Sequence, residues 1–243
     1  MNNAEQILAS LLALANPQKA QNSLRYFKTA KEQYGHGDLF LGITMPQLRQ
    51  TVKNFKHATL DVAVELLHSD WHEVRMCALL LLVQQFKCAD EQVKQQVFEC
   101  YLQHSRFINN WDLVDCSAYL IVGPYLQNKP RSVLYDLAQS DLLWDRRIAV
   151  IATLHFIRQR DFTDILALAE LLINESQDLM HKAVGWMLRE VGNRDKQAEL
   201  GFLTRHYQQM PRTMLRYAIE KFPEPERQTF LHNKVAINSK HHN

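Results

Sequence analysis

The sequence predicts an all-α fold, an α-solenoid built from stacked antiparallel helix pairs. Three observations lead to this prediction: apolar residues recur at the helical period along most of the chain, Gly and Pro number only 7 each, and similar helical segments repeat. A β architecture would need many more turn-forming residues. With 243 residues, 47% of them hydrophobic, the chain can bury a substantial core.

Cap and turn residues divide the periodic pattern into individual helices. The expected helices span residues 4–15, 18–28, 61–68, 71–86, 90–104, 111–126, 130–139, 142–158, 162–173, 177–191, 195–209, 211–222 and 225–232, and another begins near Pro46. Thr44 and Gln47 form a capping-box pattern at its start. Residues 29–44 are the longest irregular stretch, and their conformation is left open by the sequence.

Similar segments begin at residues 71, 111, 144, 180 and 210, which are 30 to 40 residues apart. Each has a polar or basic first turn, then a small residue and aliphatic residues. This repetition is typical of HEAT-like helical repeats, in which one helix pair cannot bury its apolar face alone. We therefore expect a single domain over residues 1–233 and a frayed tail over residues 234–243.

In a solenoid of this kind, the second helix of each pair would line a concave surface. The polar and aromatic residues expected there are Arg75, Trp111, Asp115, Arg146, Arg147, Lys182, Trp186, Arg189, Arg212 and Arg216. A net charge of +2 can hide a local basic stripe of this type. Each Arg alone is explained by a solvated helix face, but the group favours a groove for a polyanion such as nucleic acid.

Trp111 and Asp115 are four residues apart and so share one face of a helix. Taken alone, they are explained by packing at a helix start, where Asp112 would be a first-turn acid. A carboxylate in a phosphate-binding groove, however, repels the ligand and gains nothing for binding. One reaction that needs little more than a carboxylate is cleavage of an N-glycosidic bond to a cationic base, in which the sugar becomes oxocarbenium-like. Trp rings would stabilise that charge by cation–π attraction.

Other chemistries have little support in the sequence. The His residues are dispersed, no catalytic triad or metal-ligand spacing stands out, and residues 35–37 do not fit a phosphate loop, so we expect no metal and no cofactor. The four Cys lack a CxxC spacing and are expected to be reduced thiols. The N-terminus has no signal-peptide pattern, and the longest apolar run is too short to span a bilayer. A cytoplasmic protein without membrane contact is expected.

Three motifs resemble those of the HEAT-like-repeat alkylpurine DNA glycosylases, the AlkD-like family. These are Trp111-Asp112-Leu113-Val114-Asp115, Trp144-Asp145-Arg146-Arg147 and the segment from Lys182 to Glu190. The similarity runs from Tyr26-Phe27-Lys28 and Phe40-Leu41-Gly42-Ile43 to about Phe222. One departure is residues 29–38, which look longer than in the best-known members and leave open how the N-terminal edge meets DNA.

The resemblance implies excision of N3- and N7-alkylated purines from duplex DNA without flipping of the base into a pocket. It implies that Asp115 is the catalytic carboxylate and that Trp111 and Trp186 flank the lesion. It also implies that Arg147 contacts phosphate and that Tyr26 lies near the DNA-binding edge.

The resulting hypothesis is a monomeric, monofunctional DNA glycosylase in which Arg146, Lys182 and Arg189 support Arg147 at the phosphates. No Lys nucleophile is assigned, so hydrolysis without strand cleavage is expected. Two alternatives stay open: a non-catalytic DNA-binding paralogue of the same fold, and a HEAT-like scaffold for an acidic protein partner.

Overall fold

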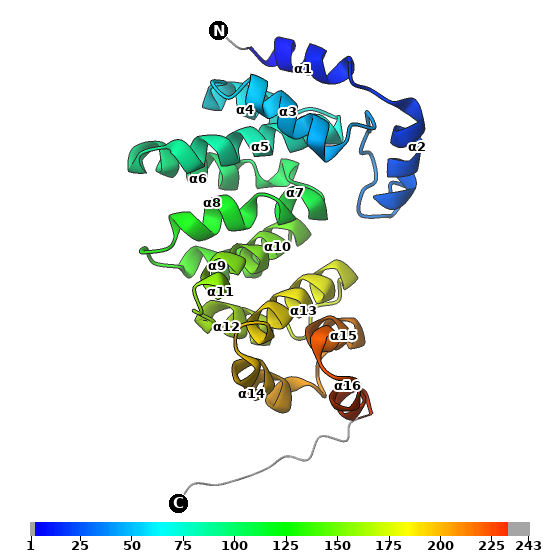
Figure 1. Cartoon of the computed structure of the whole chain (residues 1–243), viewed down its shortest axis with the longest axis vertical. Helices are drawn as coiled ribbons and strands as arrows, with labels where there is room; N and C mark the ends of the chain where they lie inside the picture. The colour runs from blue at the N-terminus through cyan, green and yellow to red at the C-terminus, as the bar shows by residue number, and fades with distance from the viewer. Residues whose placement is uncertain (1–2, 233–243) are drawn as a thin grey trace, which may run out of the picture. The chain divides into compact units, whose positions relative to one another are not determined.

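The computed structural model describes residues 3–232, and the regular secondary structure within this range is helical (Figure 1). The one β-bridge recorded there pairs Leu39 with Trp71. The prediction of an all-α fold of packed helices is therefore confirmed. The predicted tail, residues 234–243, lies outside the described residues.

The chain forms two compact units, Met1–Lys129 and Pro130–Asn243, and each is described by itself. The predicted single domain over residues 1–233 stays a prediction. Within the described range, no helix is both long and apolar enough to cross a membrane.

The helices of the first unit lie close to the predicted positions. They are α1 (Ala4–Leu12), α2 (Pro17–Tyr26), α3 (Met45–Asn54), α4 (Leu60–Leu67), α5 (His72–Cys88), α6 (Glu91–Gln103), the 3-10 helix η1 (Ser105–Phe107), α7 (Trp111–Asp115) and α8 (Ala118–Tyr125). Side chains of Asn3, Asn16, Thr59 and Asp90 cap helix starts. The predicted capping box is confirmed, because Gln47 Oε1 accepts from the Thr44 amide at 3.0 Å.

α5 is the central helix of the first unit and packs against α3, α4, α6, α7 and α8. Residues 72–79 of this helix are all buried, including the charged Glu73 and Arg75. A helix that is covered on all sides has no solvent face, which explains why its sequence is apolar without clear amphipathicity. Its first turn is therefore a rigid base for the segments that lie against it.

The second unit is built around α13. Its helices are α9 (Ser132–Ala138), α10 (Leu143–Ala152), α11 (Leu154–Arg158), α12 (Thr163–Leu171), α13 (Asp178–Gly192), α14 (Lys196–His206), α15 (Arg212–Ala218), η2 (Ile219–Lys221) and α16 (Glu224–Leu231). α13 packs against α10, α11, α12, α14 and α15. Its approach to α15 is close enough that a Cβ added to Gly185 would lie 2.4 Å from the Met214 carbonyl oxygen.

Two helices that the sequence predicts as continuous are broken in the structure. The predicted helix 111–126 divides at Ser117, whose Oγ donates to the Leu113 carbonyl at 2.6 Å. The predicted helix 142–158 divides at Thr153, whose Oγ1 donates to the Val150 carbonyl at 2.6 Å. In both cases a buried hydroxyl competes with the backbone for helical carbonyl groups. The predictions of continuity were wrong for this reason.

Candidate functional site

α7 carries two of the predicted site residues, Trp111 and Asp115, at its two ends. The Asn110 side chain caps its start by accepting from the Trp111 amide at 2.9 Å. Leu113 and Val114 are fully buried, whereas Trp111, Asp112 and Asp115 are partly exposed. This short amphipathic helix therefore presents an aromatic side chain and a carboxylate at the border of the core, on one side of its axis.

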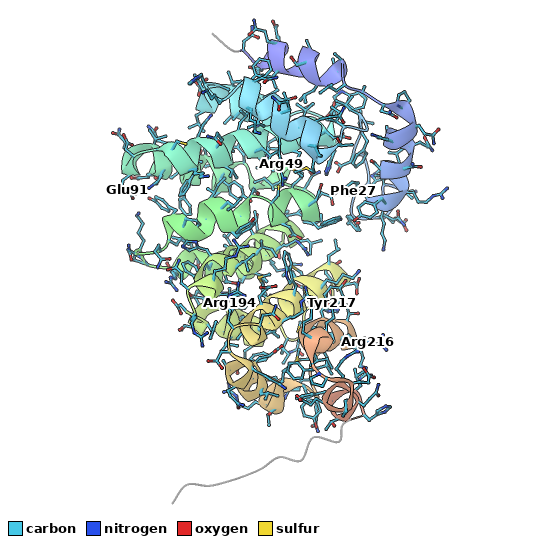
Figure 2. All side chains as sticks on the ribbon, in the orientation of Figure 1. Phe27, Arg49, Glu91, Arg194, Arg216 and Tyr217 are labelled. Atoms are coloured by element: carbon cyan, nitrogen blue, oxygen red, sulfur yellow. The ribbon has the colours of Figure 1, made fainter. Side chains whose placement is uncertain are left out.

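Trp111 is part of an aromatic cluster that also contains the end of α2. Its ring stacks on Phe27, with centroids 5.7 Å apart and planes at 27°. Tyr26 contacts it edge-on at 5.9 Å and is 64% exposed. The structure thus brings Tyr26 and Trp111 together, although the sequence singled them out separately. Phe27 contacts both rings and was not among the predicted site residues; its position is labelled in Figure 2.

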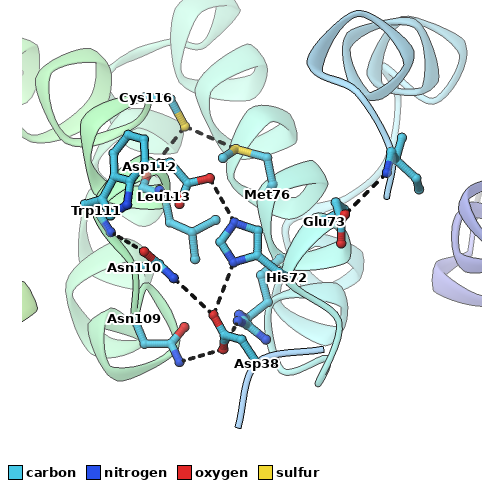
Figure 3. A network of polar contacts seen from close by, with 12 residues as sticks. Asp38, His72, Glu73, Met76, Asn109, Asn110, Trp111, Asp112, Leu113 and Cys116 are labelled. Atoms are coloured by element: carbon cyan, nitrogen blue, oxygen red, sulfur yellow. Dashed lines mark hydrogen bonds and ion pairs between the residues drawn. The ribbon is translucent and has the colours of Figure 1, made fainter. Parts of the chain in front are cut away.

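A buried polar network lies under α7, and its centre is His72, the first residue of α5 (Figure 3). His72 Nε2 lies 2.8 Å from Asp112 Oδ2, and His72 Nδ1 lies 3.3 Å from Asp38 Oδ2. Asp112 is in the first turn of α7, as predicted, and in addition is the partner of a histidine. The sequence did not predict this second role, because His72 and Asp38 are 40 and 74 residues from Asp112.

Asp38 is the most extensively bonded carboxylate of the network. It accepts from Arg75 Nη2 at 2.6 Å and from the side-chain amides of Asn109 and Asn110 at 3.3 and 3.2 Å. Arg75 was expected on the basic surface, but it is only 4% exposed. That expectation is corrected: the buried ion pair with Asp38 places Arg75 in the core.

The pKa values of this network follow from its burial and pairing. Burial alone would lower the pKa of His72, but the hydrogen bonds to Asp112 and Asp38 outweigh it and raise the pKa to about 9. Burial alone would raise the pKa of Asp38, but the hydrogen bond from His72 and the charge of Arg75 hold it below its ordinary value. His72 is therefore an imidazolium at neutral pH.

The last part of the irregular stretch 29–44 is fixed by the first turn of α5. The buried Glu73 carboxylate accepts from the amides of Leu41, Gly42 and Ile43 at 2.8 to 3.3 Å. Gly42 has a φ of +77°, and a Cβ there would lie 2.2 Å from the Asn16 carbonyl oxygen. The end of α2 and the segment after it are therefore held by α5, which also supports α7.

In the second unit, α13 carries three of the predicted site residues. Trp186 is partly exposed, and its Nε1 donates to Glu190 at 3.4 Å. Lys182 forms an ion pair with Asp178 at 2.6 Å, and Arg189 forms one with Glu220. Both cations are thus neutralised within the chain, which weakens the potential that they present to a ligand.

The two predicted arginines of α10 are also engaged inside the second unit. Arg146 Nε donates to Glu175 at 2.7 Å, and Arg146 Nη1 donates to the Ser140 carbonyl. Arg147 is only 4% exposed, and its Nη1 donates to the Leu179 carbonyl in the first turn of α13 at 2.6 Å. One contact of Arg147 is thus with the helix that carries Lys182 and Trp186.

The sequence reasoning missed a second group of cations, which flanks Tyr26 along the chain. Lys19, Arg25, Lys28 and Lys31 are all exposed, and none of them forms an ion pair within the described residues. Only Glu32 opposes them in the segment 17–32. Clustering of charge along the sequence could have identified this surface, which we call the α2 cationic edge.

These features define a helical-repeat protein with an aromatic–carboxylate pair on α7 and a cationic edge beside it. The chain belongs to the DNA alkylation repair enzyme family, whose sequence profile matches residues 7–222. The resemblance that the motifs indicated is therefore confirmed at the level of the family, and DNA is the substrate class that this family implies.

Comparison with solved structures supports the fold. A structure described as a predicted DNA alkylation repair enzyme from Enterococcus faecalis superimposes with a TM-score of 0.68 at 17% sequence identity. The match covers 86% of this chain and 97% of that chain. At this identity the likeness shows the fold alone. No curated protein sequence matches the chain.

Proposed function

We propose that the protein is a monofunctional DNA glycosylase that hydrolyses the N-glycosidic bond of cationic N3- and N7-alkylated purines in duplex DNA. The observation that carries the proposal is the placement of Asp115 and Trp111 on one short, partly exposed helix, with Tyr26 against Trp111. An aromatic face and a carboxylate together suit a sugar that becomes positively charged.

The reaction follows from these two side chains. The bond between C1′ and the base nitrogen breaks, and its electron pair neutralises the cationic base, which leaves without a general acid. Asp115 stabilises the oxocarbenium-like sugar and accepts the proton of the water that adds to C1′. The products are the free alkylated base and an abasic site, and the phosphodiester backbone stays intact. Trp111 stabilises the developing charge through its ring face.

The second unit supplies supporting contacts in this proposal. Trp186 is a second aromatic contact for the deoxyribose, and Arg146, Lys182 and Arg189 are phosphate contacts. Each of these cations would exchange an internal carboxylate for a phosphate, which reduces the net gain of each contact. Arg147 would have to leave its buried position to touch phosphate, so its observed bond to Leu179 favours support of the first turn of α13.

The test is release of 7-methylguanine from methylated duplex DNA under single-turnover conditions. Asp115→Asn is expected to slow release by about 100-fold or more, because removal of one electrostatic group from a transition-state site has an effect of this size. Asp61→Asn is the matched control, because Asp61 is an exposed carboxylate on α4 and should leave the rate unchanged.

Equal rates for wild type and Asp115→Asn would remove Asp115 from its proposed role. Duplex binding without base release by the wild type would favour the non-catalytic DNA-binding alternative. Absence of duplex binding at low salt would favour the protein scaffold.

A further inference from the structure

His72 is a buried cation that the proposed reaction does not use, and it touches the site helix by two separate routes. Through its ring nitrogen Nε2 it binds Asp112, the residue next to Trp111 on α7. Through its ring face it contacts Phe27, with centroids 4.8 Å apart, and Phe27 stacks on Trp111. The first route ends on α7 beside Trp111, and the second ends at the Trp111 ring.

The geometry requires the charged form of His72. Both ring nitrogens face carboxylate oxygens, at 2.8 and 3.3 Å. A neutral imidazole has only one N–H, so the lone pair of its other nitrogen would face an anionic oxygen. The imidazolium donates to both carboxylates.

The imidazolium also lies among aromatic rings. Phe27 and Phe40 contact the ring at centroid distances of 4.8 and 4.7 Å, with interplanar angles of 37° and 25°. Rings stacked in this way present their negative faces to the cation, and burial strengthens that attraction. The same cation therefore holds two carboxylates and two aromatic side chains.

The segments that meet at His72 are distant in the sequence. They are the end of α2 with Phe27, the loop with Asp38 and Phe40, and α7 with Asp112, all placed on the first turn of α5. A cavity of about 110 Å³, lined in part by Phe27, Phe40, Met76 and Asp112, lies beside the ring. His72, Phe27 and Asp112 all line this cavity, so the two residues through which His72 reaches α7 lie around one space.

We propose that His72 is a positioning residue for the site: its imidazolium fixes α7 through Asp112 and fixes the Trp111 ring through Phe27. The inference rests on the proposed function for its effect on catalysis, but the placement of Trp111 is measurable without any reaction. His72 touches neither the sugar nor the base in this proposal, so it acts only through Trp111 and the α7 backbone that carries Asp115.

The first measurement is the fluorescence of Trp111 in the protein without DNA. The Trp111 signal is the difference between each protein and the same protein with Trp111→Phe, which removes the contributions of the other three Trp residues. In His72→Gln, which keeps polar groups but no charge, this signal should shift to longer wavelength and become more accessible to acrylamide. Asp112→Asn should produce the same change.

Two further variants make the comparison specific. His104→Gln is the control, because His104 is a partly buried histidine that bonds to the Cys100 carbonyl and whose ring contacts are with His68 and Phe107 rather than with α7. Its Trp111 signal should equal that of the wild type. Asp112 has a side chain that is 18% exposed, so Asp112→Asn tests the same link even where His72→Gln does not fold.

The second measurement is single-turnover base release together with duplex affinity. His72→Gln should slow release by about 10- to 100-fold, the size expected for a small misplacement of reacting groups, while the duplex affinity stays unchanged. In a background that carries both Trp111→Phe and Asp115→Asn, His72→Gln should have little further effect, because both groups whose positions it sets are then already changed.

An unchanged Trp111 signal in both His72→Gln and Asp112→Asn would overturn the inference, whatever the catalytic result. An equal loss of activity in His104→Gln would also overturn it, because the loss would then reflect general destabilisation. Failure of the wild type to release base would reject the proposed glycosylase activity, and the fluorescence comparison would still decide whether His72 positions Trp111.

Discussion

Asp112 and Asp115 lie one turn apart on α7 and have different environments. Asp112 is bound by the His72 imidazolium, whereas Asp115 is the last residue of the helix. The end of a helix is an unfavourable place for a carboxylate, because the backbone carbonyls there also carry negative charge. Burial raises the pKa of the neighbouring Cys116 thiol, and the charges of Asp112 and Asp115 add to this effect.

The residue-scale prediction concerns pH and His72. Its pKa is raised from 6.5 to about 9 on folding, so its stabilisation is fully present below pH 6.5 and is lost as the pH rises through 9. The groups that face it are Asp38 and Asp112, with Arg75 on its own helix. We expect the free energy of unfolding to fall between pH 6.5 and 9.

Urea unfolding of the wild type and of His72→Gln at a series of pH values measures this effect. The fall between pH 6.5 and 9 should be smaller in His72→Gln and unchanged in His104→Gln. Glu199, whose pKa burial raises to about 8, adds a separate loss of stability between its ordinary value of 4.5 and 8 in all three proteins. Identical pH profiles for wild type and His72→Gln would contradict the assignment of a buried imidazolium.

At the scale of elements, α5 and α13 are the central helices of their units and carry or support the site residues. α5 holds residues 41–43 through Glu73 and holds α7 through His72. α13 packs closely on α15 because Gly185 has no side chain at the contact. The candidate site residue Trp186 directly follows this glycine, so the helix contact sets where the indole emerges.

The element-scale prediction uses two glycines in helices. Gly185→Ala would place a methyl group 2.4 Å from the Met214 carbonyl oxygen and 2.6 Å from Tyr217 Cβ, so it should destabilise the protein by about 1–3 kcal/mol through overpacking. Gly201→Ala is the control, since nothing lies within 4 Å of its added Cβ. It should stabilise α14 by about 0.5–1 kcal/mol.

Urea unfolding followed by circular dichroism gives both values. If Gly185→Ala instead stabilises the protein as much as Gly201→Ala does, the contact between α13 and α15 does not depend on the absence of a side chain at position 185.

At the scale of the whole molecule, charge pairing distinguishes two sets of basic residues. The chain has 28 Lys and Arg against 26 Asp and Glu, which leaves a net charge of only +2. Arg146, Lys182 and Arg189 are neutralised by internal carboxylates. The α2 cationic edge is exposed and opposed only by Glu32 in its own segment. It is therefore the stronger candidate for the electrostatic attraction of DNA.

The whole-molecule prediction concerns the salt dependence of duplex binding. Replacement of Arg25, Lys28 and Lys31 together by Ala should weaken binding. It should also reduce the slope of log affinity against log salt by roughly 0.9 for each phosphate that the variant no longer neutralises. Fluorescence anisotropy with a labelled duplex at several salt concentrations measures the slope.

The control for this prediction replaces Lys87, Lys94 and Lys129 by Ala, which changes the charge equally. Lys94 and Lys129 are both paired with Glu91, and this triple variant should bind with nearly the wild-type slope. Equal slopes for the two triple variants would show that the α2 cationic edge does not bind phosphate.

Much of the fold could be predicted from the sequence, because helices and their caps depend on residues a few positions apart. The helical period located most helices, and the Thr44–Gln47 capping box was predicted correctly. The breaks at Ser117 and Thr153 could not be predicted, because a buried hydroxyl gives no periodic signal. For the candidate site, the sequence indicated Trp111, Asp115 and Tyr26 but not Phe27 or His72, whose importance depends on contacts between distant segments.

The sequence by itself determined the all-α class and the family, because periodicity and short motifs are local properties of the chain. Only the tertiary structure decided the charge of His72, the partner of Asp112, the burial of Arg75 and Arg147, and the internal pairing of the cations on α10 and α13. The physical reason is that these properties are set by desolvation and by pairing between groups that are far apart in sequence, as for Asn110 and Asp38, 72 residues apart.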